Sequence, residues 1–188
     1  MAPTGVAVTP DGKYVYVADT YRTLDGDIGV VDIIDTATNA IMKKVTVGGG
    51  PNGVAVSPDG GKIYVTNSND GTVSVIDVAT NIVATTVPAG LTPVGVAVSP
   101  DGKTVYVANS QSSTVSVIDT STSTVSAILT GFNWPNGVAF TPDGKMVYVA
   151  NWGSDELVGI DTGTNTIKTT VPVGRRPYAF GQFICSIP

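Results

Sequence analysis

The segment Pro93–Thr130 reads PVGVAVSPDGKTVYVANSQSSTVSVIDTSTSTVSAILT, and edited copies of it fill nearly the whole chain. The residue that opens each copy falls at Gly5, Gly53, Gly95, Gly137 and, at the end, Ala179. The spacings are 48, 42, 42 and 42 residues, so the first copy is six residues longer than the others. A period of about 40 to 45 residues, made only of strands and turns, is typical of the four-stranded blades of a β-propeller.

Each copy contains four short runs rich in Val, Ile, Tyr and Thr, separated by clusters of turn-forming residues. In the quoted copy these runs are GVAVSP, KTVYVAN, TVSVIDT and TVSAILT, the pattern of successive antiparallel strands. The second run is apolar at consecutive positions over Val105–Ala108, as expected of a sheet that is covered on both faces. Pro-Asp-Gly at 58–60, 100–102 and 142–144 predicts tight turns between the first and second strands. We therefore predict an all-β propeller of four-stranded antiparallel blades.

The repeat predicts one domain over residues 1–188 in which four full blades are followed by an extra strand. The blades are expected at about residues 4–48, 52–90, 94–131 and 136–174, and the extra strand at 178–185. A self-contained ring of four blades would not need that strand, so we predict part of a seven- or eight-bladed ring. Repeat arrays need polar caps at their ends, and the terminal copies keep the apolar pattern of the inner ones. We therefore expect self-association through the terminal blades, as a homo-oligomer.

A tetrapeptide at the end of the second strand links the chain to a known repeat family. It reads YVTN from Tyr64, YVAD from Tyr16, and YVAN from Tyr106 and Tyr148. The motifs PxGVAVSPDGK, YVxN and VSVIDT recur in the same order and spacing over essentially the full chain. By these motifs the chain resembles the YVTN family of β-propeller repeats, typified by archaeal and bacterial surface-layer proteins. The resemblance implies a propeller, usually of seven blades and often secreted or on the cell surface, and it implies no single activity.

Charge and hydropathy argue against two classes of partner. The net charge is −5, and the ten Lys and Arg residues form no basic stretch, which argues against nucleic acid. No apolar run is long enough for a membrane span, and the start MAPTGVAVTP lacks the regions of a signal peptide. Because the resemblance implies an extracellular or cell-surface location, we expect a fragment whose upstream part is missing, or else a cytoplasmic relative.

Residue types that many enzymes require are absent or single. The chain has no histidine, which excludes Ser-His-Asp and Cys-His nucleophiles, histidine-ligated haem and imidazole zinc sites. Its one cysteine, Cys185, allows neither an intrachain disulfide nor a thiolate metal cluster. We therefore expect a non-enzymatic protein without a cofactor. The alternative is a lactonase-like or lyase-like propeller enzyme that holds a metal in its central channel by carboxylates and amides.

Two groups of polar residues are weak candidates for binding a cation. The second strand of each copy ends on Asp19, Asn67, Asn109 or Asn151. These side-chain oxygens could ligate a cation, but each is explained as readily as a cap on its own loop. Asp25 and Asp27, in the long first loop, resemble part of a calcium loop but lack the Glu that closes an EF-hand. We therefore predict no metal site.

The departures from the repeat predict a binding surface on one face. Strands alternate in direction, so the turns between strands one and two and between strands three and four share one face of the propeller. The other connections share the opposite face, and the departures at 20–27, 132–134, 152–156 and 175–178 all fall there. Exposed aromatic residues on variable loops above a rigid scaffold are the usual components of a binding surface.

Both tryptophans of the chain lie in these variable loops. Trp134 lies in the loop that leads into the fourth copy, and Trp152 lies in the loop between the second and third strands of that copy. The two side chains should therefore be neighbours. They either pack on each other over the blade edge or bind a protein or glycan ligand. The candidate residues are Tyr21, Arg22, Phe132, Asn133, Trp134, Trp152, Asp155 and Arg175. We predict a cell-surface or secreted module with a structural, adhesive or ligand-binding role, and a lectin-like carbohydrate binder is a further alternative.

Overall fold

The chain forms four antiparallel sheets of four strands each in a computed structural model that describes residues 2–24 and 26–179. The strands of the first two sheets are β1 (Val6–Val8), β2 (Tyr14–Thr23), β3 (Gly26–Asp35), β4 (Ala40–Thr46), β5 (Pro51–Val56), β6 (Lys62–Asn67), β7 (Thr72–Asp77) and β8 (Ile82–Pro88). Those of the last two are β9 (Pro93–Val98), β10 (Thr104–Asn109), β11 (Thr114–Asp119), β12 (Thr124–Leu129), β13 (Pro135–Phe140), β14 (Met146–Asn151), β15 (Glu156–Asp161) and β16 (Thr166–Pro172). Within each sheet the strands follow chain order. The predicted all-β fold with four-stranded antiparallel blades is confirmed.

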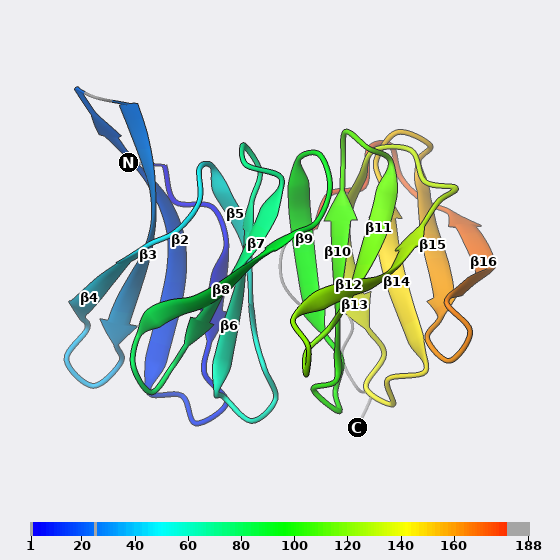
Figure 1. Ribbon diagram of the computed structural model, residues 1–188. Helices are drawn as coiled ribbons and strands as arrows, with labels where there is room; N and C mark the ends of the chain where they lie inside the picture. The colour runs from blue at the N-terminus through cyan, green and yellow to red at the C-terminus, as the bar shows by residue number, and fades with distance from the viewer. Residues whose placement is uncertain (1, 25, 180–188) are drawn as a thin grey trace.

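The four sheets, named blade 1 to blade 4 from the N-terminus, stand side by side (Figure 1). Neighbouring blades meet through their first strands, because β5 lies against β1 and β9, and β9 also lies against β13. These first strands approach so closely that a Cβ on Gly95 would lie 2.0 Å from the carbonyl oxygen of Asn136. The same close approach occurs at Gly53, where a Cβ would lie 2.3 Å from the carbonyl oxygen of Val94. The glycine that opens each copy is therefore required by the packing of the blades.

No helix in the part of the chain that the structure describes could span a membrane.

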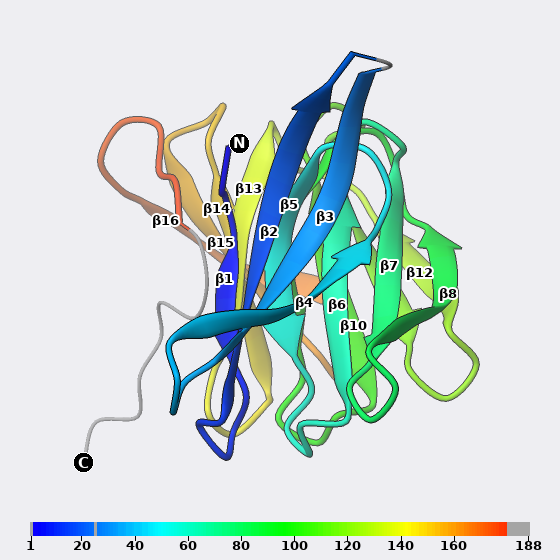
Figure 2. The same cartoon turned by 90° about the vertical axis from the view of Figure 1, so that its left-hand side faces the viewer.

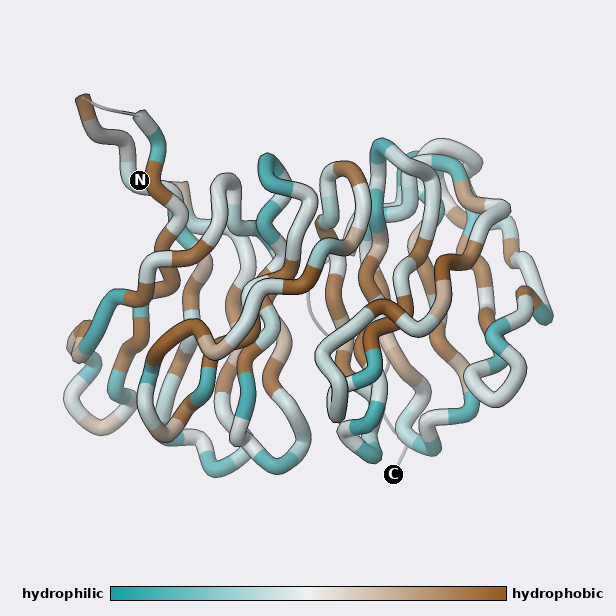
Figure 3. The backbone as a smooth tube through the Cα atoms, viewed as in Figure 1, coloured by the Kyte–Doolittle hydropathy of each residue, from teal (hydrophilic) through white to brown (hydrophobic). Residues whose placement is uncertain are grey.

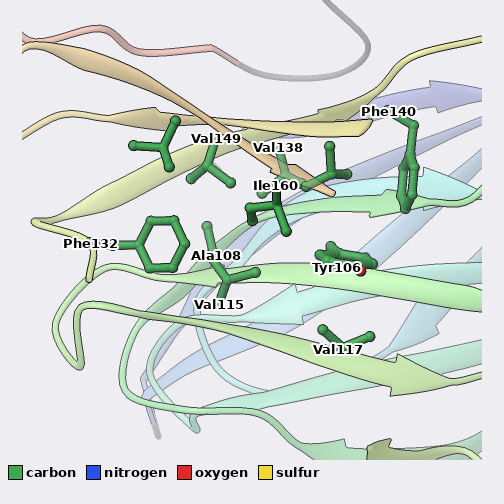
Figure 4. Close-up of a cluster of buried hydrophobic side chains, with 11 residues drawn as sticks. Tyr106, Ala108, Val115, Val117, Phe132, Val138, Phe140, Val149 and Ile160 are labelled. Carbon is green, nitrogen blue, oxygen red and sulfur yellow. The ribbon is translucent and has the colours of Figure 1, made fainter. Parts of the chain in front are cut away.

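The hydrophobic core lies between the blades. Apolar residues line the strands, whereas polar residues gather at the turns (Figure 3). Along β10, Val105 and Val107 belong to the cluster shared with blade 2, whereas Tyr106 and Ala108 belong to the cluster shared with blade 4. The second cluster is shown in Figure 4. Both faces of the strand are buried, which explains why its sequence is apolar without alternation.

The two ends of the array differ from its interior. Val6 and Val8 in blade 1 are 58% and 53% exposed, whereas Val54, the residue that corresponds to Val6 in blade 2, is 6% exposed. At the other end, Ala179 lies beside Gly137, where a Cβ on this glycine would be 2.7 Å from the Ala179 carbonyl oxygen. The rest of the predicted extra strand at 178–185, including Cys185, lies outside the described residues. Self-association through the terminal blades stays a prediction.

The first hairpin corrects one detail of the sequence prediction. Residues 20–27, expected as a long loop, mostly continue β2 and β3 as a paired ladder that includes Tyr21 opposite Ile28 and Thr23 opposite Gly26. The β-branched and aromatic residues of this segment favour strands, so the extra residues lengthen the hairpin. It projects beyond the neighbouring blades (Figure 2).

An aspartate holds each tight turn between the first two strands of a blade. Asp101 accepts hydrogen bonds from the Ser99 hydroxyl at 2.6 Å and from the Lys103 backbone N–H at 3.1 Å. These bonds favour the charged carboxylate and hold the pKa of Asp101 below its usual value. Hydrogen bonds also lower the pKa of the aspartates in the other turns on the same face. These are Asp11, Asp59 and Asp143 between first and second strands, and Asp35, Asp77, Asp119 and Asp161 between third and fourth strands.

We expect the protein to lose stability when the pH falls below about 4. The pKa of each turn aspartate is lower in the folded chain than in the unfolded chain. Its contribution to the free energy of unfolding is therefore complete above the pKa of the unfolded chain. The contribution is lost as the pH falls through the pKa of the folded chain, which is about 2 for Asp11. Thermal unfolding followed by circular dichroism should give a constant midpoint from about pH 7 to 5 and a falling one below about pH 4. A midpoint that rises on acidification would contradict this assignment.

Candidate functional site

The two tryptophans lie side by side on the face formed by the connections between blades and by the turns between second and third strands, which we call the loop face. The backbone N–H of Trp152 donates to the Trp134 backbone carbonyl at 3.2 Å, and the backbone N–H of Gly153 donates to the Asn133 backbone carbonyl at 2.9 Å. The Asn133 side-chain amide also donates to the Gly153 carbonyl at 3.0 Å. These bonds join the two loops, so the indole rings are held with centroids 6.2 Å apart and planes tilted by 54°. The predicted proximity of the tryptophans is confirmed.

Arg176 extends this aromatic pair into a row. Its guanidinium carbon lies 4.9 Å from the centroid of the Trp152 ring, in the arrangement of a cation–π contact. Its backbone N–H donates to the Asp155 carboxylate at 2.7 Å, and the Val173 N–H donates to the Asp155 carbonyl at 2.9 Å. Asp155 thus fixes the segment that leaves blade 4. We name Trp134, Trp152 and Arg176 the Trp–Arg row.

Trp134 and Arg176 occupy the same place in successive copies of the repeat. Each precedes a proline and has left-handed backbone, with φ of 51° and 54°, and Thr92 and Gly50 hold this place earlier in the chain with φ of 52° and 63°. Glycine fits such a conformation, whereas other residues are less stable there by about 1–2 kcal/mol. Trp134 nevertheless remains 46% exposed. Packing of the core does not account for a large side chain at this place, which favours a role in binding.

The acidic side chains beside the row accept hydrogen bonds from a backbone N–H and a hydroxyl, and neither pairs with a guanidinium group of a described residue. One oxygen of Asp155 accepts the Arg176 backbone N–H, and Glu156 accepts the Ser154 hydroxyl at 2.7 Å. Arg175 is exposed. The ion pairs found between described residues all use lysines, so none engages the guanidinium groups of Arg175 or Arg176.

Phe132 corrects the predicted binding set, because it faces the core. It is only 7% exposed and belongs to the cluster between blades 3 and 4. Figure 4 shows its ring beside Ala108 and Val115. The corresponding residues of other copies are Gly48, Gly90 and Gly174. A phenylalanine at this place fills space between two blades and does not reach the ligand-accessible surface.

Tyr21 and Arg22 do not join the Trp–Arg row. They lie in the hairpin of blade 1, at the opposite end of the array from blade 4 (Figure 1). The Tyr21 hydroxyl donates to Asp32 at 2.9 Å and contacts Lys44, whose Nζ lies 2.8 Å from the other Asp32 oxygen. These partners raise the pKa of Lys44 above its usual value. Tyr21 therefore belongs to a charged cluster that covers part of the outer face of blade 1.

The asparagines at the ends of the second strands bond locally. The Asn67 amide donates to the hydroxyls of Thr72 and Ser74, each at 2.9 Å, and Asn109 makes the corresponding bonds to Thr114 and Ser116 at 3.2 and 2.9 Å. The Asn151 oxygen accepts the backbone N–H of Asn133 at 2.7 Å. Each side chain therefore supports its own blade, as a loop cap does. Asp27 lies in the exposed hairpin, and Asp25 lies outside the described residues.

The first strands of the four blades line an open hollow of about 520 Å³. Its lining consists of Val, Ala, Pro, Phe and Thr residues from the first strands and the turns that follow them, for example Val54, Ala97 and Phe140. Among the described residues that line it, none carries a carboxylate or a side-chain amide. Among the described residues, no three acidic or cysteine side chains form a group that could hold a metal ion. The chemistry of the loop face and that of the hollow therefore differ.

Sequence reasoning assigned Arg175 to the site but missed Arg176. A signal for Arg176 was present, because it lies 42 residues after Trp134 and thus at the same position of the repeat. The contact of the Arg176 guanidinium with Trp152 depends on how the chain leaves blade 4, which repeat spacing alone does not specify.

Comparisons with known proteins support the fold. A model of the YNCE-like beta-propeller family matches residues 55–146 and 99–183. Hydrazine synthase of Kuenenia stuttgartiensis is similar in structure, with a TM-score of 0.81 and 28% identity over 90% of this chain and 48% of that chain. A functionally unknown protein from Desulfotomaculum acetoxidans shares the fold alone, with a TM-score of 0.75 and 19% identity over 94% of this chain and 59% of that chain. The chain thus spans less than two thirds of either protein. A search of curated proteins finds no match.

Proposed function

Because the chain belongs to the YNCE-like β-propeller family, we propose that it is a non-enzymatic binding module whose ligand docks on the loop face at the Trp–Arg row. The observation that carries the proposal is the row of neighbouring side chains Trp134, Trp152 and Arg176, in which two residues hold a left-handed backbone while Trp134 stays 46% exposed. Tryptophan and arginine are the residues most enriched in binding hot spots. A secreted or cell-surface location, as in YVTN surface-layer proteins, is part of this proposal and rests on the sequence resemblance.

The rigidity of the site supports binding. Backbone hydrogen bonds join the loops of Trp134 and Trp152, and Asp155 ties Arg176 to the same blade. A ligand would therefore meet side chains that are already in place, and little conformational entropy would be lost on binding.

We expect a double variant, Trp134→Ala with Trp152→Ala, to lose the ligands of the wild-type protein on glycan and peptide arrays. Removal of a hot-spot aromatic costs about 2 kcal/mol or more, which is about 30-fold in affinity. Isothermal titration with a glycan or peptide identified on the arrays measures this loss. The matched control is Thr92→Ala, which alters the same left-handed position in the preceding copy and should bind normally. The proposal fails if the double variant folds and retains the array profile, or if the wild-type protein binds nothing on either array.

A further inference from the structure

We infer that the Trp–Arg row recognises a sugar ring that bears a carboxylate, as in a uronic-acid polysaccharide. The inference rests on the proposed function and specifies the ligand class of the same site. It follows from the chemistry of three components that the structure brings together: an exposed indole, a second indole beside it, and a guanidinium over the second indole.

The guanidinium of Arg176 is placed to bind a carboxylate. Its guanidinium carbon lies 4.9 Å from the centroid of the Trp152 ring, and Arg176 is exposed, so a ligand can reach an edge of the guanidinium. A planar guanidinium binds a carboxylate through two parallel N–H···O bonds made by that edge. The ion pairs between described residues all use lysines, and Asp155 bonds to the Arg176 backbone. Among the described residues, no carboxylate side chain therefore pairs with the guanidinium group of Arg176.

The indole rings provide the apolar part of the site. A pyranose ring exposes C–H groups on its faces and hydroxyls around its edge, so a face can rest on an aromatic ring while the hydroxyls stay in water or bond to polar neighbours. Trp134 is 46% exposed, which leaves apolar ring surface open for such a contact. Asn133 lies in the same loop and is exposed, so its side-chain oxygen can accept a hydrogen bond from a sugar hydroxyl while its amide donates to the Gly153 carbonyl.

The placement of the arginines also favours an anionic ligand at this place. The chain carries only three arginines and a net charge of −5, yet two of the three, Arg175 and Arg176, are adjacent at the row. Two of the three guanidinium groups therefore lie at the row, where the neighbouring carboxylates of Asp155 and Glu156 bond to a backbone N–H and a hydroxyl. A neutral saccharide would use the rings but would leave the guanidinium edge without an ionic partner, whereas an acidic saccharide uses both.

The test is titration calorimetry of the full chain with α-1,4-linked trigalacturonate and with neutral galactotriose. We expect wild-type protein to bind the acidic trisaccharide at least about tenfold more tightly, since a charge-assisted bidentate pair contributes at this level. Arg176→Gln should abolish the preference, so that the two trisaccharides bind with similar affinity. Lys103→Gln is the matched control, because it removes one positive charge from an exposed turn lysine on the opposite face. A thermal melt of each variant establishes that it is folded.

The outcomes separate this inference from the proposed function. Equal binding of both trisaccharides, or full retention of the preference in Arg176→Gln, overturns the acidic-sugar inference and leaves a binding role for the tryptophans intact. Binding of array peptides alone, lost in the double tryptophan variant, does the same. If no ligand on the arrays or in the titrations depends on Trp134 and Trp152, both the inference and the proposed function fail.

Discussion

Replacing Tyr106 with alanine should lower the free energy of unfolding by about 3–5 kcal/mol, the cost typical of truncating a large buried aromatic residue. The side chain is 1% exposed between blades 3 and 4. Its ring meets Phe140 edge to face at 5.3 Å, and its hydroxyl donates to the Asn165 side chain in the neighbouring blade. Alanine would remove the ring contact and leave a cavity at the centre of an interface. Urea unfolding followed by circular dichroism measures the change.

Tyr148→Ala is the control for this substitution. Tyr148 holds the same place in blade 4, but it is only partly buried because no further blade among the described residues covers that face. Its truncation should cost less than half as much as that of Tyr106. Equal losses at the two positions would show that contact between blades is not the main source of stability at Tyr106. Tyr106→Phe, which keeps the ring and removes one hydrogen bond, should cost about 1 kcal/mol.

Gly95→Ala should destabilise the protein by about 3 kcal/mol or more, at the upper end of the range for overpacking a core. The new Cβ would lie 2.0 Å from the carbonyl oxygen of Asn136 and 3.1 Å from the α-carbon of Gly137. Both neighbours are backbone atoms, so no side chain can rotate away to relieve the clash, and β9 and β13 must move apart. Because these strands join blades 3 and 4, the clusters on either side loosen as well. The same urea titration tests this substitution.

The matched control is Gly163→Ala in the exposed turn between β15 and β16. The nearest atom to a Cβ there is a carboxylate oxygen of Asp161 at 3.5 Å, an ordinary contact. We expect a change within about 0.5 kcal/mol. If Gly95→Ala were as well tolerated as this control, the glycine that opens each copy would not be required by the packing of the first strands.

The fold was predictable because its determinants are local and repeated. The Pro-Asp-Gly turns specify tight connections through the conformational preferences of three adjacent residues, and the apolar run of Val105–Ala108 indicates a strand with two buried faces. Neither inference needs information from a distant part of the chain. The length of the first hairpin was harder to predict, because a six-residue insertion can form a loop or continue a ladder, and only the pairing of Tyr21 with Ile28 distinguishes these outcomes.

The candidate site was predictable in part. Departures from the repeat located the loops of Trp134 and Trp152, and the topology brought them together. The direction of a side chain within such a loop depends on packing between blades, so Phe132 was placed on the surface although it is 7% exposed. Arg176 was missed for a related reason, since its contact with Trp152 joins the entry and exit segments of blade 4 in three dimensions.

The pre-proline position held by Gly50, Thr92, Trp134 and Arg176 has an evolutionary consequence. It recurs every 42 residues at a boundary between blades, and glycine, a hydroxyl, an indole and a guanidinium all occupy it on the same backbone. The residue at this position can therefore change from blade to blade while the sequence of the strands stays the same. A combinatorial library restricted to these four positions would therefore vary the chemistry of the loop face while keeping the strands of the propeller.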